Sequence, residues 1–184
     1  TNRRVTEPGD VVVIDIGAEV HGYSADVTRT IPGSGTDSPE QRAIYELVYR
    51  AQDAGIRAPR AGNPFFASDN EASRVLAEGL AELGLISSAA DTGGLRRFFM
   101  HGTSHYLGLD VHDVGSYGSL RPGEVVTIEP GIYIPVAEDI DPKWWNIGIR
   151  IEDDVLVTDG DPVILSAGAP RQIDDVEALM RSIS

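Results

Sequence analysis

Three of the four histidines in this chain lie in the segment MHGTSHYLGLDVHDVG, residues 100–115. They are His101, His105 and His112. Histidine changes its charge near neutral pH, and its neutral imidazole is the commonest metal ligand in proteins. The clustering therefore predicts a site that binds metal or handles protons, provided that other parts of the chain supply partners.

Four acidic residues interrupt segments that otherwise have the composition of apolar strands. They are Asp15 after VVVI, Asp26 within YSADVTRT, Glu129 after VVTI and Glu152 after IRI. Carboxylates are almost never fully buried unless they are paired or bound to metal. Any one of the four could be a strand-end residue that reaches solvent. Four of them, together with a histidine cluster, favour convergence on one site.

The spacing of these residues supports convergence. Residues two apart in a strand share a face, so Arg150 and Glu152 are expected to point to the same side. Asp15 and Asp26 flank a hairpin that we expect to turn near Gly22. Such a hairpin can bring both carboxylates to one edge of a sheet.

Several carboxylates with one imidazole make an oxygen-rich ligand set. Such a set suits Mn²⁺ and tolerates Co²⁺ or Zn²⁺, whereas a structural zinc site usually contains more nitrogen or sulfur. Four ionised carboxylates carry about four negative charges, which two divalent ions would neutralise. Hydrolytic sites with two metals hold the ions roughly 3.5–4 Å apart. The pattern therefore favours a dinuclear site with Mn²⁺ as the preferred metal.

The elements that must position these residues begin with strands. The run VVVIDIG, residues 11–17, has the composition of a buried strand, and residues 19–31 are expected to pair with it as an antiparallel neighbour. A helix is predicted to begin at Ser38-Pro39-Glu40, with Ser38 as the N-cap. A second helix is predicted to begin near Ser68.

The second half of the chain is predicted to be mostly strands. Residues 121–134 are expected to form a strand pair that turns at Pro130-Gly131, residues 146–158 a second pair, and residues 173–182 a short helix. The order of strands, two helices and further strands indicates an α+β fold with a largely antiparallel sheet. No repeated βαβ unit is visible.

Composition narrows the class of protein. A chain of 184 residues with 41% apolar residues is expected to form one domain with a sizeable core. Its net charge of −14 argues against a nucleic-acid partner. The lack of cysteine excludes disulfides and thiolate zinc sites and agrees with a cytoplasmic location. No apolar run approaches the ~20 residues that span a bilayer, so no membrane partner is expected.

The ordered acidic and histidine residues resemble the ligand set of the "pita-bread" metallopeptidases, which include methionine aminopeptidase, prolidase and Xaa-Pro aminopeptidase. The segments IDIGAEVHGYSADVTRT, FFMHGTSHYLGLDVHDVG, TIEPGIYI and GIRIEDDVLVT are most similar to Xaa-Pro aminopeptidase (aminopeptidase P). The resemblance implies a curved, mostly antiparallel sheet with helices on its outer face. It also implies a hydrolase that releases the N-terminal residue from peptides with proline at the second position.

The resemblance assigns a role to each candidate residue. Asp15 would bind one ion, His105 and Glu129 the other, and Asp26 and Glu152 would bridge the two. Glu129 would also accept a proton from the attacking water, and His112 would hydrogen-bond the oxyanion. His101 would line the site for the substrate proline, and Arg150 would orient carboxylates.

The resemblance also concerns the extent of the chain. In relatives, an N-terminal domain and a first part of the catalytic domain precede the strand of Asp15, so residues 1–184 are expected to correspond to the C-terminal catalytic part. The pita-bread domain would then be incomplete at its N-terminus. We therefore expect an exposed apolar strand at residues 11–14, a homo-oligomer, and low activity of this chain by itself.

Several alternatives stay open or are disfavoured by particular residues. Prolidase shares all five ligands and differs mainly in requiring a dipeptide. A non-catalytic binding relative and creatinase, which needs no metal, are disfavoured because every ligand is present. Methionine aminopeptidase is disfavoured because its last glutamate lies in a different context from IRIED. An α+β domain with an incidental acidic cluster is the remaining alternative.

Overall fold

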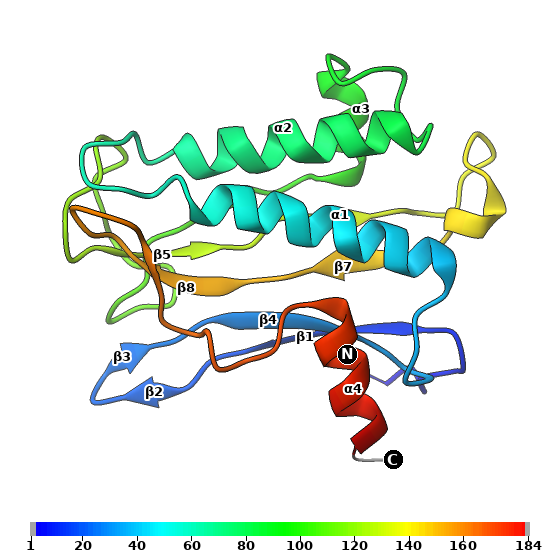
Figure 1. The fold of residues 1–184 in the computed structure, drawn as a ribbon, viewed down its shortest axis with the longest axis horizontal. Helices are drawn as coiled ribbons and strands as arrows, with labels where there is room; N and C mark the ends of the chain where they lie inside the picture. Colours follow the sequence, from blue (N-terminus) through cyan, green and yellow to red (C-terminus); the bar gives the residue numbers. More distant parts are fainter. Residues whose placement is uncertain (1–2, 183–184) are drawn as a thin grey trace.

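The computed structural model describes residues 3–182 as a mixed α/β structure in which every strand pair is antiparallel (Figure 1). The strands are β1 Val11–Ile16, β2 Glu19–Val20, β3 Tyr23–Ser24, β4 Val27–Pro32, β5 Val125–Ile128, β6 Gly131–Tyr133, β7 Gly148–Arg150, β8 Asp153–Leu156 and β9 Val163–Ile164. The helices are α1 Pro39–Ile56, α2 Ala67–Glu82, α3 Thr92–Phe98 and α4 Ile173–Ser182, with a 3-10 turn at Pro142–Trp144. The predicted fold class is confirmed.

Helix α1 begins where the sequence predicts. The Ser38 hydroxyl accepts the backbone N–H of Gln41 at 3.1 Å, and the Gln41 side chain accepts the N–H of Ser38 at 2.9 Å. Pro39 occupies the first turn, where its missing N–H costs nothing. Helix α1 packs against β5, β6 and β7, so it covers strands that flank Glu129 and Glu152.

Helix α2 begins at Ala67, one residue before the predicted start, and lies alongside α1 (Figure 1). The two helices approach closely at Gly79, where an added Cβ would lie within 2.2 Å of Leu47 Cδ1. Helix α3 was not predicted, because Gly93 and Gly94 lower helix propensity. It forms because Asp91 accepts the N–H of Gly94 at 2.8 Å and caps its first turn.

The hairpin around Gly22 is confirmed. β1 pairs with β4, and the chain turns at His21 and Gly22, which both have positive φ angles of 54° and 84°. The prediction that β1 is buried is wrong: its first four residues are half-buried, and Ile16 is 67% exposed. Residues 11–14, which were expected to be exposed, are therefore only half-exposed, and the exposed apolar side chain of this strand is that of Ile16.

The predicted pairing in the second half of the chain is wrong in one respect. β5 does not fold back on β6, nor β7 on β8; instead β5 pairs with β8, and β6 pairs with β7. The two strand pairs share one continuous register: Val125 is paired with Leu156 in the first and Gly131 with Arg150 in the second. The two segments therefore form one long hairpin that is interrupted in its middle, and the chain reverses only between β6 and β7.

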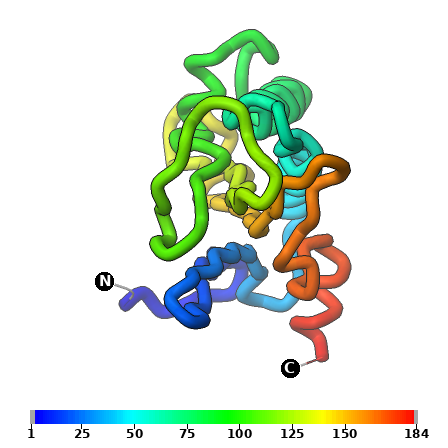
Figure 2. Tube along the Cα trace, turned by 90° about the vertical axis from the view of Figure 1, so that its left-hand side faces the viewer, coloured from blue at the N-terminus to red at the C-terminus, as the bar shows by residue number. Residues whose placement is uncertain are grey.

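The interrupted hairpin and the β1–β4 hairpin join side by side. The N–H of Glu152 donates to Thr28 O at 3.0 Å, and the Thr30 hydroxyl donates to Arg150 O at 2.9 Å. An end-on view shows the segment 100–118, in green, descending toward the blue β2–β3 hairpin (Figure 2). The N–H of Ser24 donates to Gly108 O at 2.8 Å and ties the two together. Among residues 3–182, no helix has the length and apolar character needed to cross a membrane.

Candidate metal centre

The β1–β4 hairpin brings Asp15 and Asp26 into the same neighbourhood. Asp15 faces Thr28 in the register, and Asp26 immediately precedes β4. The backbone after β1 passes so close to residue 25 that a Cβ at Gly17 would lie 1.8 Å from Ala25 O. Only glycine allows this approach, and Asp15 is near enough to Asp26 to raise its pKa. The predicted convergence of these two acids is observed.

Three of the five predicted ligands form a group that could hold a metal ion. The ligand atoms of Asp26, His105 and Glu152 all lie within 4.8 Å of one another. His105 Nε2 is 3.6 Å from Asp26 Oδ2. These residues come from three segments that are far apart in the sequence, so the fold alone creates the group.

Glu129 completes the group from the break in the long hairpin. Its Oε1 lies 3.4 Å from His105 Nε2. The shared register places Glu129 opposite Glu152, at the point where the ladder is interrupted. The interruption therefore brings two acidic side chains face to face.

The orientation of His105 is set by its backbone neighbours. Its Nδ1 lies 3.0 Å from Tyr106 O, so Nδ1 carries the proton and donates to this carbonyl. The backbone N–H of His105 donates to the Thr127 hydroxyl at 3.1 Å. Nε2 is left free toward the carboxylates, as expected for a metal-ligating imidazole whose other nitrogen is hydrogen-bonded.

Asp15 differs from the other predicted ligands because a cation already contacts it. Arg150 Nη2 donates to Asp15 Oδ2 at 2.6 Å. The same guanidinium donates to Tyr133 OH at 3.1 Å and to the Thr28 hydroxyl at 3.3 Å. Arg150 and Glu152 both contact the Thr28 hydroxyl, so their side chains share a face, while Ile149 is buried in the core cluster, in agreement with the predicted alternation.

The site also contains two threonines and a tyrosine, which the sequence did not indicate. The Thr28 hydroxyl donates to Glu152 Oε2 at 2.6 Å, and the Thr127 hydroxyl lies 3.5 Å from Glu129 Oε1. Tyr133 OH contacts Arg150. The threonines lie two residues from predicted ligands on the same strand face, so the alternation used for Arg150 could have found them.

The remaining histidines lie in different surroundings. His101 Nε2 is 2.8 Å from Tyr133 OH, so it is linked to Arg150 through Tyr133 and does not contact the carboxylates directly. His112 is exposed, and its ring stands perpendicular to that of His105 with centroids 4.3 Å apart. His21 is exposed at the hairpin turn, as expected.

Burial and mutual repulsion disfavour the ionised forms of three of these carboxylates. Burial raises the pKa of Glu129 to about 7 and that of Glu152 to about 8, and neighbouring carboxylates add to both shifts. Burial and the charge of Asp15 also raise the pKa of Asp26. Divalent cations would reverse these shifts by favouring the ionised carboxylates. The oxygen-rich set with one free imidazole nitrogen therefore fits divalent metal ions.

The fold and the site together define a metallopeptidase. A profile of metallopeptidase family M24 matches residues 1–159, and the chain belongs to this family. The name of the family implies divalent metal ions at the site, in agreement with the group formed by Asp26, His105 and Glu152.

Similar proteins carry more specific names. The chain is 44% identical to the Xaa-Pro aminopeptidase of Haemophilus influenzae, over 97% of this chain and 44% of that protein. It is 47% identical to Xaa-Pro aminopeptidase 1 of Streptomyces coelicolor, over 95% of this chain and 38% of that protein. The Pseudomonas aeruginosa aminopeptidase PepP superposes with a TM-score of 0.94 at 40% identity, over 98% of this chain and 43% of the other. The fold is therefore the pita-bread fold, and the chain spans less than half the length of these relatives.

Proposed function

We propose that this chain carries the dinuclear metal centre of an Xaa-Pro aminopeptidase, a hydrolase that releases the N-terminal residue from peptides with proline at the second position. The observation that carries the proposal is the meeting of Asp26, His105, Glu129 and Glu152 at the break of the long hairpin. The names of the similar proteins support the substrate class. Because those proteins are more than twice as long, activity of the whole protein is part of the proposal.

The five ligands are proposed to divide as the resemblance implies. Asp26 and Glu152 lie at the junction of the two hairpins and are suited to bridge two ions, whereas His105 and Glu129 share one side of the site. Asp15 holds the other side and must exchange part of its contact with Arg150 for a metal ion. We propose Mn²⁺ as the metal, with Co²⁺ or Zn²⁺ as alternatives, because the set is rich in oxygen.

Each remaining residue has a defined task in this reaction. Bound metal ions would polarise the substrate carbonyl and lower the pKa of a water molecule toward ~7. Glu129 would take up the proton at its carboxylate, because its Oε1 lies beside the ligand group, 3.4 Å from His105 Nε2. His112, exposed and beside the His105 ring, donates a hydrogen bond to the carbonyl oxygen as charge develops there. Arg150 keeps the Asp15 carboxylate in place.

His101 and Tyr133 are proposed to bind the substrate proline. Their side chains are joined by a contact of 2.8 Å, and Phe99 packs edge-on against the His101 ring at 4.9 Å. The Tyr133 ring and the His101 imidazole suit contact with the apolar pyrrolidine ring, and Phe99, which is 1% exposed, supports the His101 ring from the core. Burial lowers the pKa of His101, which favours the neutral imidazole that such an apolar contact needs.

The test is peptide hydrolysis with purified protein that contains this chain and has been loaded with Mn²⁺. Release of the N-terminal residue from a Xaa-Pro tripeptide, with a Xaa-Pro dipeptide left intact, would support the aminopeptidase. Cleavage of the dipeptide would show a prolidase instead. A protein that binds no metal and cleaves neither peptide would support a non-catalytic binding module. The Glu152→Ala variant is the control for contaminating peptidases.

The location and the domain assignment remain predictions. We propose, from the resemblance of the ordered ligand residues, that residues 1–184 represent the C-terminal part of a catalytic domain; the chain spans 44% and 43% of two relatives. The cytoplasmic location and the homo-oligomer predicted from the sequence await measurement.

A further inference from the structure

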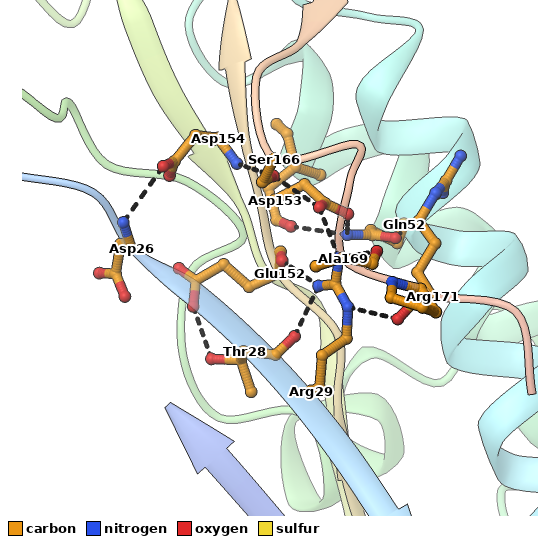
Figure 3. Close-up of polar contacts among 12 residues, drawn as sticks. Asp26, Thr28, Arg29, Gln52, Glu152, Asp153, Asp154, Ser166, Ala169 and Arg171 are labelled. Carbon is orange, nitrogen blue, oxygen red and sulfur yellow. Dashed lines mark hydrogen bonds and ion pairs between the residues drawn. The ribbon is translucent and has the colours of Figure 1, made fainter. Parts of the chain in front are cut away.

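A second buried acid, Asp154, lies behind the candidate metal centre. It follows Glu152 by two residues at the start of β8, so both side chains point to the same side of that segment. Asp154 is 5% exposed. Its Oδ2 accepts the backbone N–H of Asp26 at 3.2 Å (Figure 3). Its Oδ1 is buried and has no hydrogen-bond partner among the described residues.

This contact lies where the main-chain hydrogen bonds between the segment of β4 and the segment of β8 end. The N–H of Glu152 donates to Thr28 O, which is a main-chain bond between the two segments. Two residues earlier in the chain, at Asp26, the Asp154 side chain takes the place of a main-chain acceptor. One segment therefore contacts Asp26 at two points: Asp154 accepts its backbone N–H, and Glu152 lies beside its carboxylate.

Asp154 is itself held rigidly. Its N–H donates to the Ser166 hydroxyl at 3.1 Å, and its C=O accepts the N–H of Leu165 at 2.8 Å. The Ser166 hydroxyl donates in turn to Asp153 Oδ1 at 2.6 Å. These contacts therefore fix the backbone of Asp154.

Asp153 anchors the same segment from its opposite face. It is fully buried, and it accepts Arg29 Nη2 and Gln52 Nε2, each at 2.8 Å (Figure 3). Arg29 also donates to Glu152 O. Asp153 therefore has cationic and amide partners that explain its burial, whereas the Asp154 carboxylate has the Asp26 amide as its only hydrogen-bond partner among the described residues.

A buried carboxylate with one oxygen unpartnered costs stability, so stabilising the junction of the two segments does not account for Asp154. We propose that Asp154 is a positioning residue that holds Asp26 in the geometry of a bridging metal ligand. This inference rests on the dinuclear centre proposed above. It predicts that the hydrogen bond to the Asp26 amide determines metal affinity, although Asp154 itself does not contact the metal.

The test compares Asp154→Ala with Asp154→Asn in protein that is first stripped of metal and then titrated with Mn²⁺ in a calorimeter. Loss of an outer hydrogen-bond partner typically weakens metal binding about 10–100-fold, and we expect this for Asp154→Ala. Asp154→Asn keeps an oxygen acceptor for the Asp26 amide and should keep wild-type affinity. Exchange of the Asp26 amide hydrogen in the metal-free state should speed up in Asp154→Ala and not in Asp154→Asn.

The matched control is Asp91→Ala. Asp91 also accepts one backbone N–H, from Gly94 at 2.8 Å, but it caps α3. This variant should lose thermal stability and keep its Mn²⁺ affinity. Should Asp154→Ala fail to fold, Asp154→Asn still decides, since a folded Asp154→Asn with weakened Mn²⁺ binding would overturn the inference. An Asp154→Ala variant that binds Mn²⁺ as tightly as the wild type would also overturn the inference. A wild-type protein that binds no Mn²⁺ would refute the metal centre as well.

Discussion

Glu129 and Glu152 face each other across one antiparallel register, at the only interruption of the long hairpin formed by residues 125–156 of the described chain. Two acids in opposite positions repel, so an uninterrupted ladder would be a poor place for them. Both side chains lie near His105 instead: Glu129 Oε1 is 3.4 Å from His105 Nε2, and Glu152 belongs to the ligand group of His105. The irregular backbone and the ligand set are therefore one feature of the structure.

Substitution of a carboxylate that bridges two ions should lower the metal content more than substitution of a residue that binds one ion. Asp26→Ala and Glu152→Ala should each lose both ions, because each removes a group shared by the two. His105→Ala should weaken mainly one ion. Elemental analysis after Mn²⁺ loading and gel filtration measures the ratio, with Asp161→Ala, an exposed acid paired to Arg60, as the control. Unchanged metal content in all three ligand variants would refute the assignment.

Glu152→Gln should separate stability from metal binding. In the presence of a chelator at a pH above 8 it should raise the melting temperature. Burial and the charge of Glu129 raise the pKa of Glu152 to about 8, so the wild-type carboxylate is ionised there, whereas Gln is neutral and still accepts the Thr28 hydroxyl. A gain of about 1 kcal/mol corresponds to roughly 2–4 °C for a domain of this size. With Mn²⁺ the order should reverse, since only the wild-type protein gains from the metal. Differential scanning calorimetry under both conditions checks this, and a lower melting temperature of the variant in chelator would contradict it.

The two histidines that lie outside the ligand group should affect turnover and leave metal content unchanged. His112→Ala should lower kcat about 10²-fold or more, the usual effect of losing a donor to the oxyanion. His101→Ala should act mainly on KM, because His101 contacts Tyr133 and not the carboxylates. Steady-state kinetics of the whole protein with a Xaa-Pro tripeptide provides the measurement. Loss of Mn²⁺ from His112→Ala would show that this residue is a ligand.

The contact between α4 and the start of α1 should make stability depend on pH. Burial raises the pKa of Asp37 to about 6, Glu177 adds to the shift and Arg42 opposes it, and Asp37 Oδ2 is buried without a hydrogen-bond partner among the described residues. The folded-state pKa lies above the unfolded value of 3.8. The contribution of Asp37 to stability is therefore complete below pH 3.8 and is lost as the pH rises through 6.

The Asp37→Asn substitution should remove this loss of stability at high pH. The variant should be more stable than the wild type at pH 8, by about 1–2 kcal/mol after allowance for partial exposure, and equally stable at pH 4. Urea unfolding at the two pH values gives the comparison. A stability difference that stays constant with pH would contradict the role of Asp37. Asp174→Asn, an exposed acid on α4, serves as the matched control.

The exposed face of the first hairpin should promote self-association of the chain. Ile14, Ile16 and Val27 line an apolar cavity of about 550 Å³, and within residues 3–182 β1 pairs only with β4. A free strand edge beside an apolar face favours pairing with a second copy. Sedimentation velocity should show a dimer or larger species that Ile16→Thr shifts toward monomer. A wild-type chain that stays monomeric at high concentration would contradict the prediction.

Local features of this chain were predictable because neighbouring residues determine them. The start of α1 follows from Ser38, Pro39 and Gln41, and the first hairpin follows from two apolar runs around Gly22. The candidate ligands could be found because acids that interrupt apolar runs are unusual. Their ordered match to known metallopeptidases then added the roles, which remain to be measured.

The pairing of strands and the support of the site depended on the tertiary structure. The sequence of residues 121–158 has the same alternation whether each half folds on itself or the two halves pair with each other. Only packing of the continuous segments against α1 selects the long hairpin with its break at Glu129 and Glu152. Asp154 and Thr28 act on residues more than a hundred positions away, at Asp26 and Glu152. Such contacts leave no local pattern, because their geometry exists only once distant segments lie side by side.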